Sequence, residues 1–309
     1  MSAAQRWQEP AGAVAAPPVA AGRRVAWGRV ARRIAWSRAA RHILLDGITI
    51  LLGIAFFLPF AWLVSSSLKT DAQIFVHPPQ WIPNPWVWSN YPRALQFAPF
   101  ADYAINSLRI AGLSALGATV SCALVAYGFA RIPWPGRGVF FFITLTTLMI
   151  PFQVTMVPTF LLFKWLGLAG TPWALIVPYW FGNAYFIFLL RQYLLTIPSE
   201  LSEAARIDGA SELAIFAWIV LPLARPGLAV VALFQFMHAW GDYLGPLIFL
   251  RKEEQFTVAL GLQRFLGGHM TEWGYLMAAS TMATVPIVLL FFFTQRTFIE
   301  GISLTGLKE

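Results

Sequence analysis

The chain has 309 residues, of which 58% are hydrophobic and 12% are charged. That charged fraction is about half of what a soluble domain carries, and the length suits one polytopic membrane domain better than several soluble domains. The formal charge of +8 does not indicate nucleic-acid binding, because eight of the 22 Lys and Arg residues are arginines in the first 42 positions, a clustering that indicates an orientation signal and contact with anionic lipid.

Residues 1–42 form a basic N-terminal tail. Its first part, 1–22, is rich in Ala and Pro and is expected to be disordered. The second part, 23–42, mixes arginines with Trp27, Ile34 and Trp36, and could lie as a helix on the cytoplasmic membrane face. A cleaved secretory signal is not expected, because the following apolar stretch is too long and lacks a small-residue cleavage pattern.

Six apolar stretches follow, and each is long enough to cross a membrane, which takes about 20 mostly apolar residues. The expected spans are 43–66, 103–130, 139–163, 173–195, 226–250 and 273–294. They form a transmembrane domain over 43–294, followed by a C-terminal tail at 295–309. The sequence therefore predicts an all-α polytopic membrane protein with six transmembrane helices. The loop 69–102 is rich in Pro and Trp and is expected to be an extended interfacial segment.

The distribution of basic residues predicts that both termini lie in the cytoplasm. With the N-terminus inside, the tails and inner loops hold 15 Lys and Arg residues against six in the outer loops, and Arg109 lies within the second span. An even number of spans then places the C-terminus inside as well. The loop between the fourth and fifth spans is cytoplasmic in this arrangement.

That loop, 199–225, is the longest charged and helix-favouring segment in the second half of the chain. Pro198 and Ser199 suit a helix start, and Gly209 can take the left-handed conformation that ends a helix. Asp208 or Ser211 can cap a second helix. The sequence therefore predicts a cytoplasmic helix–turn–helix, with helices at 199–207 and 210–218.

The same loop carries a spaced motif. Its residues are Glu203, Ala204, Ala205, Asp208, Gly209, Ala210, Phe216 and Pro222, with Pro226 four positions further on. This run resembles the coupling loop, or EAA loop, of permease subunits in binding-protein-dependent ABC importers. It is most similar to the second, maltose-type permease of carbohydrate importers. The segment 240–250, WGDYLGPLIFL, also resembles the family's fifth-span signature, except that Gly241 stands where an Asn commonly follows the Trp.

The resemblance implies an importer with a second permease subunit in a heterodimer, two ATPase subunits and an extracytoplasmic solute-binding protein, in a bacterial inner membrane. ATP and Mg would bind to the ATPase subunits, and this chain would bind no cofactor. The coupling loop would dock on an ATPase and transmit its closure to the spans. Carbohydrate as the solute is implied by the resemblance and by no individual residue.

Several spans carry polar residues that lipid would penalise. Gln235, His238 and Asp242 share one face of the fifth span. They either line a solute path or make interhelical hydrogen bonds, with Asp242 near the outer surface. Weaker candidates for the path are Gln153 and Thr155 in the third span, Tyr179 and Asn183 in the fourth, and Ser280 and Thr284 in the sixth.

Enzyme and metal-site motifs are absent from the sequence. It contains no G-x-x-x-x-G-K-[ST], GxSxG, HExxH or CxxC pattern, and its four histidines are far apart. The single cysteine, Cys122, is expected to pack in a span. We therefore expect a transporter and not an enzyme. Two alternatives are an ion-gradient-driven secondary transporter, for which Asp242 would be the buried carboxylate, and an exporter domain or membrane scaffold. Neither explains the cytoplasmic motif.

Overall fold

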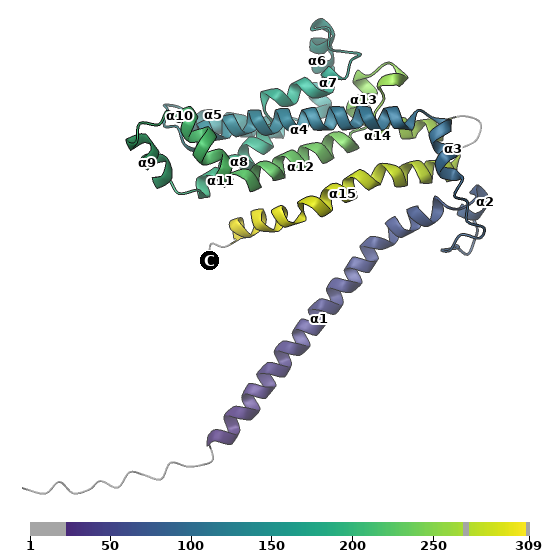
Figure 1. Cartoon of the computed structure of the whole chain (residues 1–309), viewed down its shortest axis with the longest axis horizontal. Coiled ribbons are helices and arrows are strands. Elements are labelled where there is room, and N and C mark those ends of the chain that lie inside the picture. The colour runs from purple at the N-terminus through teal and green to yellow at the C-terminus, as the bar shows by residue number, and fades with distance from the viewer. Residues whose placement is uncertain (1–22, 268–271, 307–309) are drawn as a thin grey trace, which may run out of the picture. The chain divides into compact units, whose positions relative to one another are not determined.

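A computed structural model describes residues 23–267 and 272–306 of the chain, and every regular element among them is a helix (Figure 1). This confirms the predicted all-α class. The chain divides into two units, residues 1–60 and 61–309. The tail segment 1–22, expected to be disordered, lies outside the described residues.

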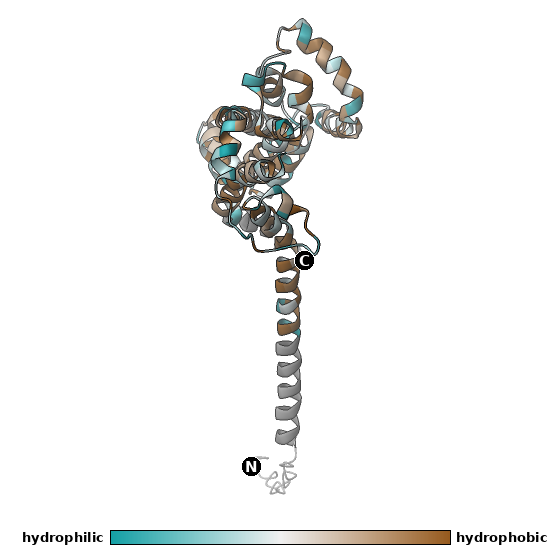
Figure 2. Ribbon diagram, turned by 90° about the vertical axis from the view of Figure 1, so that its right-hand side faces the viewer, coloured by the Kyte–Doolittle hydropathy of each residue, from teal (hydrophilic) through white to brown (hydrophobic). Residues whose placement is uncertain are grey.

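The first unit is described from Arg23 onward and consists of most of helix α1 (Arg23–Ser66). The segment 23–42 does not form a separate surface helix, because it continues without a break into the first expected span. The part of α1 from residue 41 is mostly hydrophobic (Figure 2). A helix of this composition and length can cross a bilayer.

The second unit is built around α4 (Phe100–Ala130), which packs along α12 (Arg225–Gly241) and α8 (Ala184–Thr196). Helix α15 (Trp273–Gly306) packs on α12 (Figure 1). Small buried residues such as Ala118, Ala123 and Ala126 allow these helices to approach closely. Helix α15 extends well beyond the expected span end at residue 294, so the expected C-terminal tail is helical as far as Gly306.

One of the expected spans is bent, and a second bend precedes the expected fifth span, 226–250, whose first helix ends at Gly241. The third span consists of α5 (Arg137–Thr146) with a short 3₁₀ turn (Thr147–Met149), then α6 (Phe152–Trp165) after a bend of 100°. The segment 212–241 bends by 78° between α11 (Leu221–Leu223) and α12. By length and composition the described residues contain four membrane-crossing helices, or up to six if each bent pair is one span.

Shorter helices complete the second unit. The fourth expected span begins with α7 (Trp173–Ile176) and the 3₁₀ helix η2 (Val177–Phe181) before α8, and α13 (Leu244–Phe249) follows α12. The 199–225 loop forms α9 (Glu200–Ile207), α10 (Glu212–Ile215), a π-helical turn η3 (Phe216–Val220) and α11. Segments η4 (Glu253–Gln255), α14 (Val258–Gly261) and η5 (Leu262–Leu266) precede α15.

The loop 69–102 contains α2 (Asp71–Ile74) and α3 (Asn90–Phe97). Between them the chain is irregular, with turns and bends, and exposes Trp81, Trp86 and Trp88, the last two stacked with ring centroids 6.1 Å apart. Buried Asn90 donates hydrogen bonds to the carbonyls of Ser67 and Lys69, which fixes the start of α3 against the start of the loop. These exposed tryptophans agree with the expected aromatic interfacial segment.

Candidate functional site

The glycine turn of the 199–225 loop has a complete helix-ending hydrogen-bond pattern. Gly209 has a φ of 84°, its N–H bonds the carbonyl of Arg206, and the N–H of Ala210 bonds the carbonyl of Ala205. These two bonds define a Schellman motif, which places a left-handed residue directly after the helix. Glycine is required here because a Cβ disfavours this φ. The turn therefore fixes the direction in which the chain leaves α9.

The two helices of the loop have different environments. On α9, the motif residues Glu203 and Ala204 are exposed, as is Asp208 after it. After the turn, Ser211 caps α10 by accepting a hydrogen bond from the N–H of Ala214 at 3.3 Å. The segment α10–η3 is then anchored in the interior, since Ile215, Phe216 and Val220 belong to the hydrophobic core with residues of α4, α8 and α12. Phe216 is thus a core residue.

A polar link connects this loop to α4. The Tyr127 hydroxyl donates to Oε2 of Glu212 at 2.8 Å, and the Tyr127 ring lies 5.0 Å from that of Phe216. The other carboxylate oxygen of Glu212 accepts from Nε of Arg206 at 2.5 Å, and this hydrogen bond raises the pKa of the Arg206 guanidinium. The link therefore joins α9, α10 and α4 through side chains alone.

Arg131, at the end of α4, holds the segment that leads into α9. Its guanidinium donates to the carbonyls of Leu194 and Ile197, the former at 2.5 Å. Burial lowers the pKa of Arg131. Beside it lies a polar hollow of about 480 Å³, whose lining includes Glu200, Glu203 and Arg206. The exposed face of α9 and this hollow lie at the same end of the helical bundle as α10 (Figure 1).

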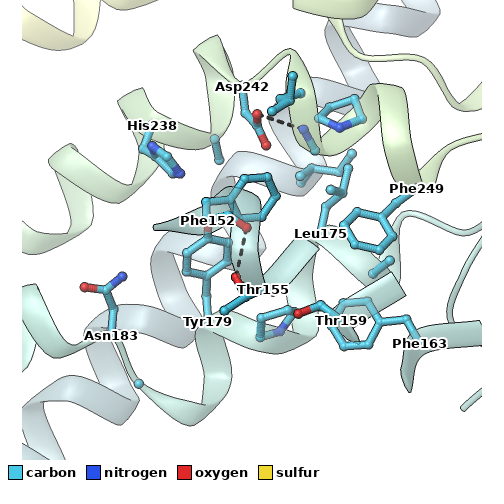
Figure 3. A pocket seen from close by; sticks show the side chains of 18 residues that line it. Phe152, Thr155, Thr159, Phe163, Leu175, Tyr179, Asn183, His238, Asp242 and Phe249 are labelled. Carbon is cyan, nitrogen blue, oxygen red and sulfur yellow. Dashed lines mark hydrogen bonds between the residues drawn. The ribbon is translucent and has the colours of Figure 1, made fainter. Parts of the chain in front are cut away.

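A second feature is a cavity of about 510 Å³ between α6, η2, α12 and α13, which we call the helix-break cavity (Figure 3). Its polar lining residues are Thr155, Thr159, Tyr179, Asn183, His238 and Asp242. Their side chains are drawn around one space with the aromatic rings of Phe152, Phe163 and Phe249. The His238 ring stands edge-on to the ring of Tyr179, with centroids 6.3 Å apart.

Five of the nine predicted pathway residues line this cavity, namely Thr155, Tyr179, Asn183, His238 and Asp242. Gln153 is exposed and outside the lining. Gln235 is 1% exposed, outside the lining, and its Nε2 has no hydrogen-bond partner among the described residues. Ser280 and Thr284 also lie elsewhere, and the Thr284 hydroxyl bonds the carbonyl of Ser280.

Asp242 has two structural roles, one at a helix start and one in the cavity. Helix α12 ends at Gly241, and Oδ1 of Asp242 accepts a hydrogen bond from the N–H of Gly245 at 3.1 Å. That bond satisfies a backbone donor at the start of α13. The same side chain also faces the helix-break cavity (Figure 3). Asp242 is therefore a helix-start cap and a cavity-lining carboxylate at once.

Sequence reasoning missed Tyr127, Glu212 and Arg131, because their partners lie between six and 85 residues away and no local spacing reveals them. Thr159 was missed too, although it lies one turn beyond Thr155. In the described part of the chain no group of three or more His, Cys, Asp or Glu could hold a metal ion. Cys122 is buried and its sulfur lies 3.2 Å from the N–H nitrogen of Asn183.

Known proteins resemble the chain over most of its length. It is 34% identical to a probable ABC transporter permease of Bacillus subtilis, YurM, across 82% of this chain and 85% of that one. It is 40% identical to AraQ, an arabinooligosaccharide transport permease of Halalkalibacterium halodurans, across 66% and 72%. It is 32% identical to UgpE, a sn-glycerol-3-phosphate transport permease of Yersinia pestis, across 77% and 87%.

The fold matches a solved structure as well. A chain of a bacterial ABC transporter that imports the acidic polysaccharide alginate superposes with a TM-score of 0.73 at 23% identity, covering 84% of this chain and 97% of that one. At this identity the match concerns the fold. It agrees with a multi-pass membrane protein.

The family model for the inner membrane component of binding-protein-dependent transport systems matches residues 103–303. That range contains the coupling loop, the helix-break cavity and the Tyr127–Glu212 link. The match confirms the expected importer permease and favours ATP-driven transport over the ion-gradient alternative. The chain belongs to the family of ABC importer permeases, the inner membrane components of binding-protein-dependent transport systems.

Proposed function

We propose that this permease passes a carbohydrate across the bacterial inner membrane, with both termini in the cytoplasm. The names of AraQ and UgpE support an oligosaccharide or a polyol derivative as the solute. ATP and Mg would act on two ATPase subunits, and a second permease would complete the path. The chain itself would catalyse no chemical step.

The observation that carries the proposal is the division of the coupling loop into an exposed and an anchored half. Helix α9 presents Glu203 and Ala204 to a partner, while Phe216 fixes α10–η3 in the core. A displacement of α9 by an ATPase is therefore passed to α4 through Glu212 and Tyr127. ATP binding would favour one of two helix packings because the docked partner interacts differently with each.

The direct experiment is ATP-dependent uptake by the assembled importer in proteoliposomes. Glu203 is exposed, and its side chain makes no hydrogen bond or ion pair with the rest of the described residues. Glu203→Lys reverses the charge at this position. We expect uptake to fall about tenfold, the loss that corresponds to 1.4 kcal/mol of weakened interaction, without loss of membrane insertion. The control is Glu254→Lys, an exposed glutamate in the loop before α14.

Unchanged uptake by Glu203→Lys would contradict the coupling role of this residue. Uptake that persists without an ATPase subunit, and stops when ion gradients are dissipated, would instead support the secondary-transporter alternative. The two results are separated by measuring uptake with and without ATP in the same vesicles.

A further inference from the structure

The helix-break cavity lies where three helical segments begin. Helix α6 starts at Phe152, α8 starts after Asn183, and α13 starts after the Asp242–Tyr243 pair. Each start leaves backbone N–H groups without partners inside its own helix. Such groups attract anions when nothing else satisfies them. What satisfies them here decides which solutes the cavity favours.

Two of the three helix starts are satisfied by side chains of this chain. Oδ1 of Asn183 accepts from the N–H groups of Tyr185 and Phe186 at 3.0 and 3.3 Å. Oδ1 of Asp242 accepts from Gly245 at the start of α13. At the starts of α8 and α13, this chain's own side chains therefore supply the compensation that an anionic solute would offer, and one of them is the Asp242 carboxylate, whereas the start of α6 has no side-chain cap.

Besides Asp242, the lining contains the imidazole of His238 and hydroxyl, amide and aromatic groups that suit a sugar. Of the 18 described residues that line the cavity none is Lys or Arg, and Asp242 is the sole carboxylate. Thr155, Thr159 and Asn183 offer hydroxyl and amide groups, while Phe152 and Tyr179 offer aromatic faces. A few fixed polar groups among aromatic walls are typical of a small-molecule site. A carboxylate or phosphate there would meet the carboxylate of Asp242, with no Lys or Arg in the lining to offset the repulsion.

We infer that the helix-break cavity selects for uncharged carbohydrate and against acidic sugars and sugar phosphates. This inference rests on the proposed function and adds that the solute is uncharged. The expected solute is then of the kind named for AraQ, an arabinooligosaccharide, and unlike the phosphate ester named for UgpE. The alginate importer shares the fold while its named solute is acidic, so the fold alone does not decide between these classes.

The charge preference of the cavity can be measured without knowing the solute. Cys122→Ala removes the sole cysteine of this chain, the other subunits of the importer are made cysteine-free, and Thr155→Cys then places one thiol in the lining while His238 is kept. The probes are two methanethiosulfonates of similar size, one carrying a trimethylammonium group and the other a sulfonate. Their rates of reaction with the cavity thiol are compared with their rates of reaction with 2-mercaptoethanol, a free thiol that gives the intrinsic reactivity ratio of the two reagents.

The expected result is that the sulfonate reagent reacts about tenfold more slowly than the cationic one after this correction, because Asp242 repels it across a low-dielectric cavity. Asp242→Asn is the matched variant, since an Asn oxygen can still accept from Gly245, and it should reduce the difference to about threefold or less. Thr159→Cys provides a second labelling position if Thr155→Cys does not assemble.

Equal corrected rates in the parent would overturn the inference, as would a faster reaction of the sulfonate reagent. No reaction with either reagent at both positions would show a cavity closed to polar solutes and would overturn it too. Uptake supplies the separate test of the proposed function. If arabinotriose is taken up and trimannuronate equally so, the inference fails while the proposed function stands. If the importer takes up no carbohydrate, the proposed function fails whatever the reagent rates.

Discussion

The hydroxyl of Tyr127 and the carboxylate of Glu212 are joined by a 2.8 Å hydrogen bond although 85 residues separate them in sequence. The bond links the last turns of α4 to the first turn of α10. Since Glu212 also holds Arg206 of α9, this pair connects the exposed half of the coupling loop to the central helix of the bundle. Its removal should therefore affect coupling more than folding.

Tyr127→Phe removes the hydroxyl and keeps the ring that packs on Phe216. The lost hydrogen bond should cost about 1 kcal/mol of folding stability. We expect fewer solute molecules to be imported per ATP hydrolysed, as measured by parallel uptake and phosphate-release assays. The control is Tyr193→Phe, because the Tyr193 hydroxyl makes no hydrogen bond within the described residues. An unchanged ratio in Tyr127→Phe would mean that the link is structural only.

Gly209→Ala forces a Cβ into a left-handed residue at φ 84°. The expected cost is about 1–2 kcal/mol locally, which should loosen the Schellman motif and lower uptake while leaving insertion intact. Gly209→Pro should be worse, since proline fixes φ near −65° and removes the N–H that bonds Arg206. The comparison is Gly138→Ala in α5, where a Cβ meets nothing within 4 Å. Wild-type uptake by Gly209→Pro would contradict the role assigned to the turn.

The loop that carries Gly209 was predictable from the sequence, whereas the contact between Tyr127 and Glu212 was not. The motif predicted the loop, and composition predicted an all-helical membrane protein, because both signals lie in contiguous residues. Five cavity residues were predicted because polar side chains inside apolar spans stand out. The cavity's shape was not predictable, since it depends on helix breaks at Pro151, Gly182 and Asp242 that bring distant segments together. Gln153 and Gln235 share the polar signal, and only their positions in the fold place them outside the lining.

Gly261→Ala tests the packing of the loop before α15. A Cβ there would lie 2.2 Å from the ring of Tyr103, which is fully buried and donates a hydrogen bond to Glu253 at 2.9 Å. The ring has no room to move, so we expect a loss of about 1–3 kcal/mol. Thermal unfolding in detergent measures it. Gly267→Ala is the control, because its nearest neighbour would be 3.9 Å away. Equal melting temperatures would refute the close packing.

The Lys69 side chain is buried, its Nζ has no hydrogen-bond partner among the described residues, and this Nζ lies 3.8 Å from the centre of the Trp62 ring. Burial lowers the pKa of this ammonium below its ordinary 10.5. Because the folded chain then binds the proton less tightly than the unfolded chain, stability should rise with pH between the lowered pKa and 10.5, and should be lowest below that window.

Lys69→Met replaces the buried charge by an apolar side chain of similar length. Because the variant also loses the interaction with Trp62, the net increase in folding stability should be about 1 kcal/mol at neutral pH. The variant should also lose the alkaline rise in stability, as measured by thermal unfolding across pH 7 to 10.5. Arg93→Met, an exposed cation on α3, is the control and should change little. Destabilisation by Lys69→Met would show that the amine has a partner outside this chain.

The breaks that shape the helix-break cavity also separate it from the coupling loop along the chain. Its lining comes from α6, η2, α13 and the last turns of α12, whereas the exposed motif residues belong to α9 and the residue after it. On the proposed function, substitutions in the cavity would change the solute without altering the surface that an ATPase contacts.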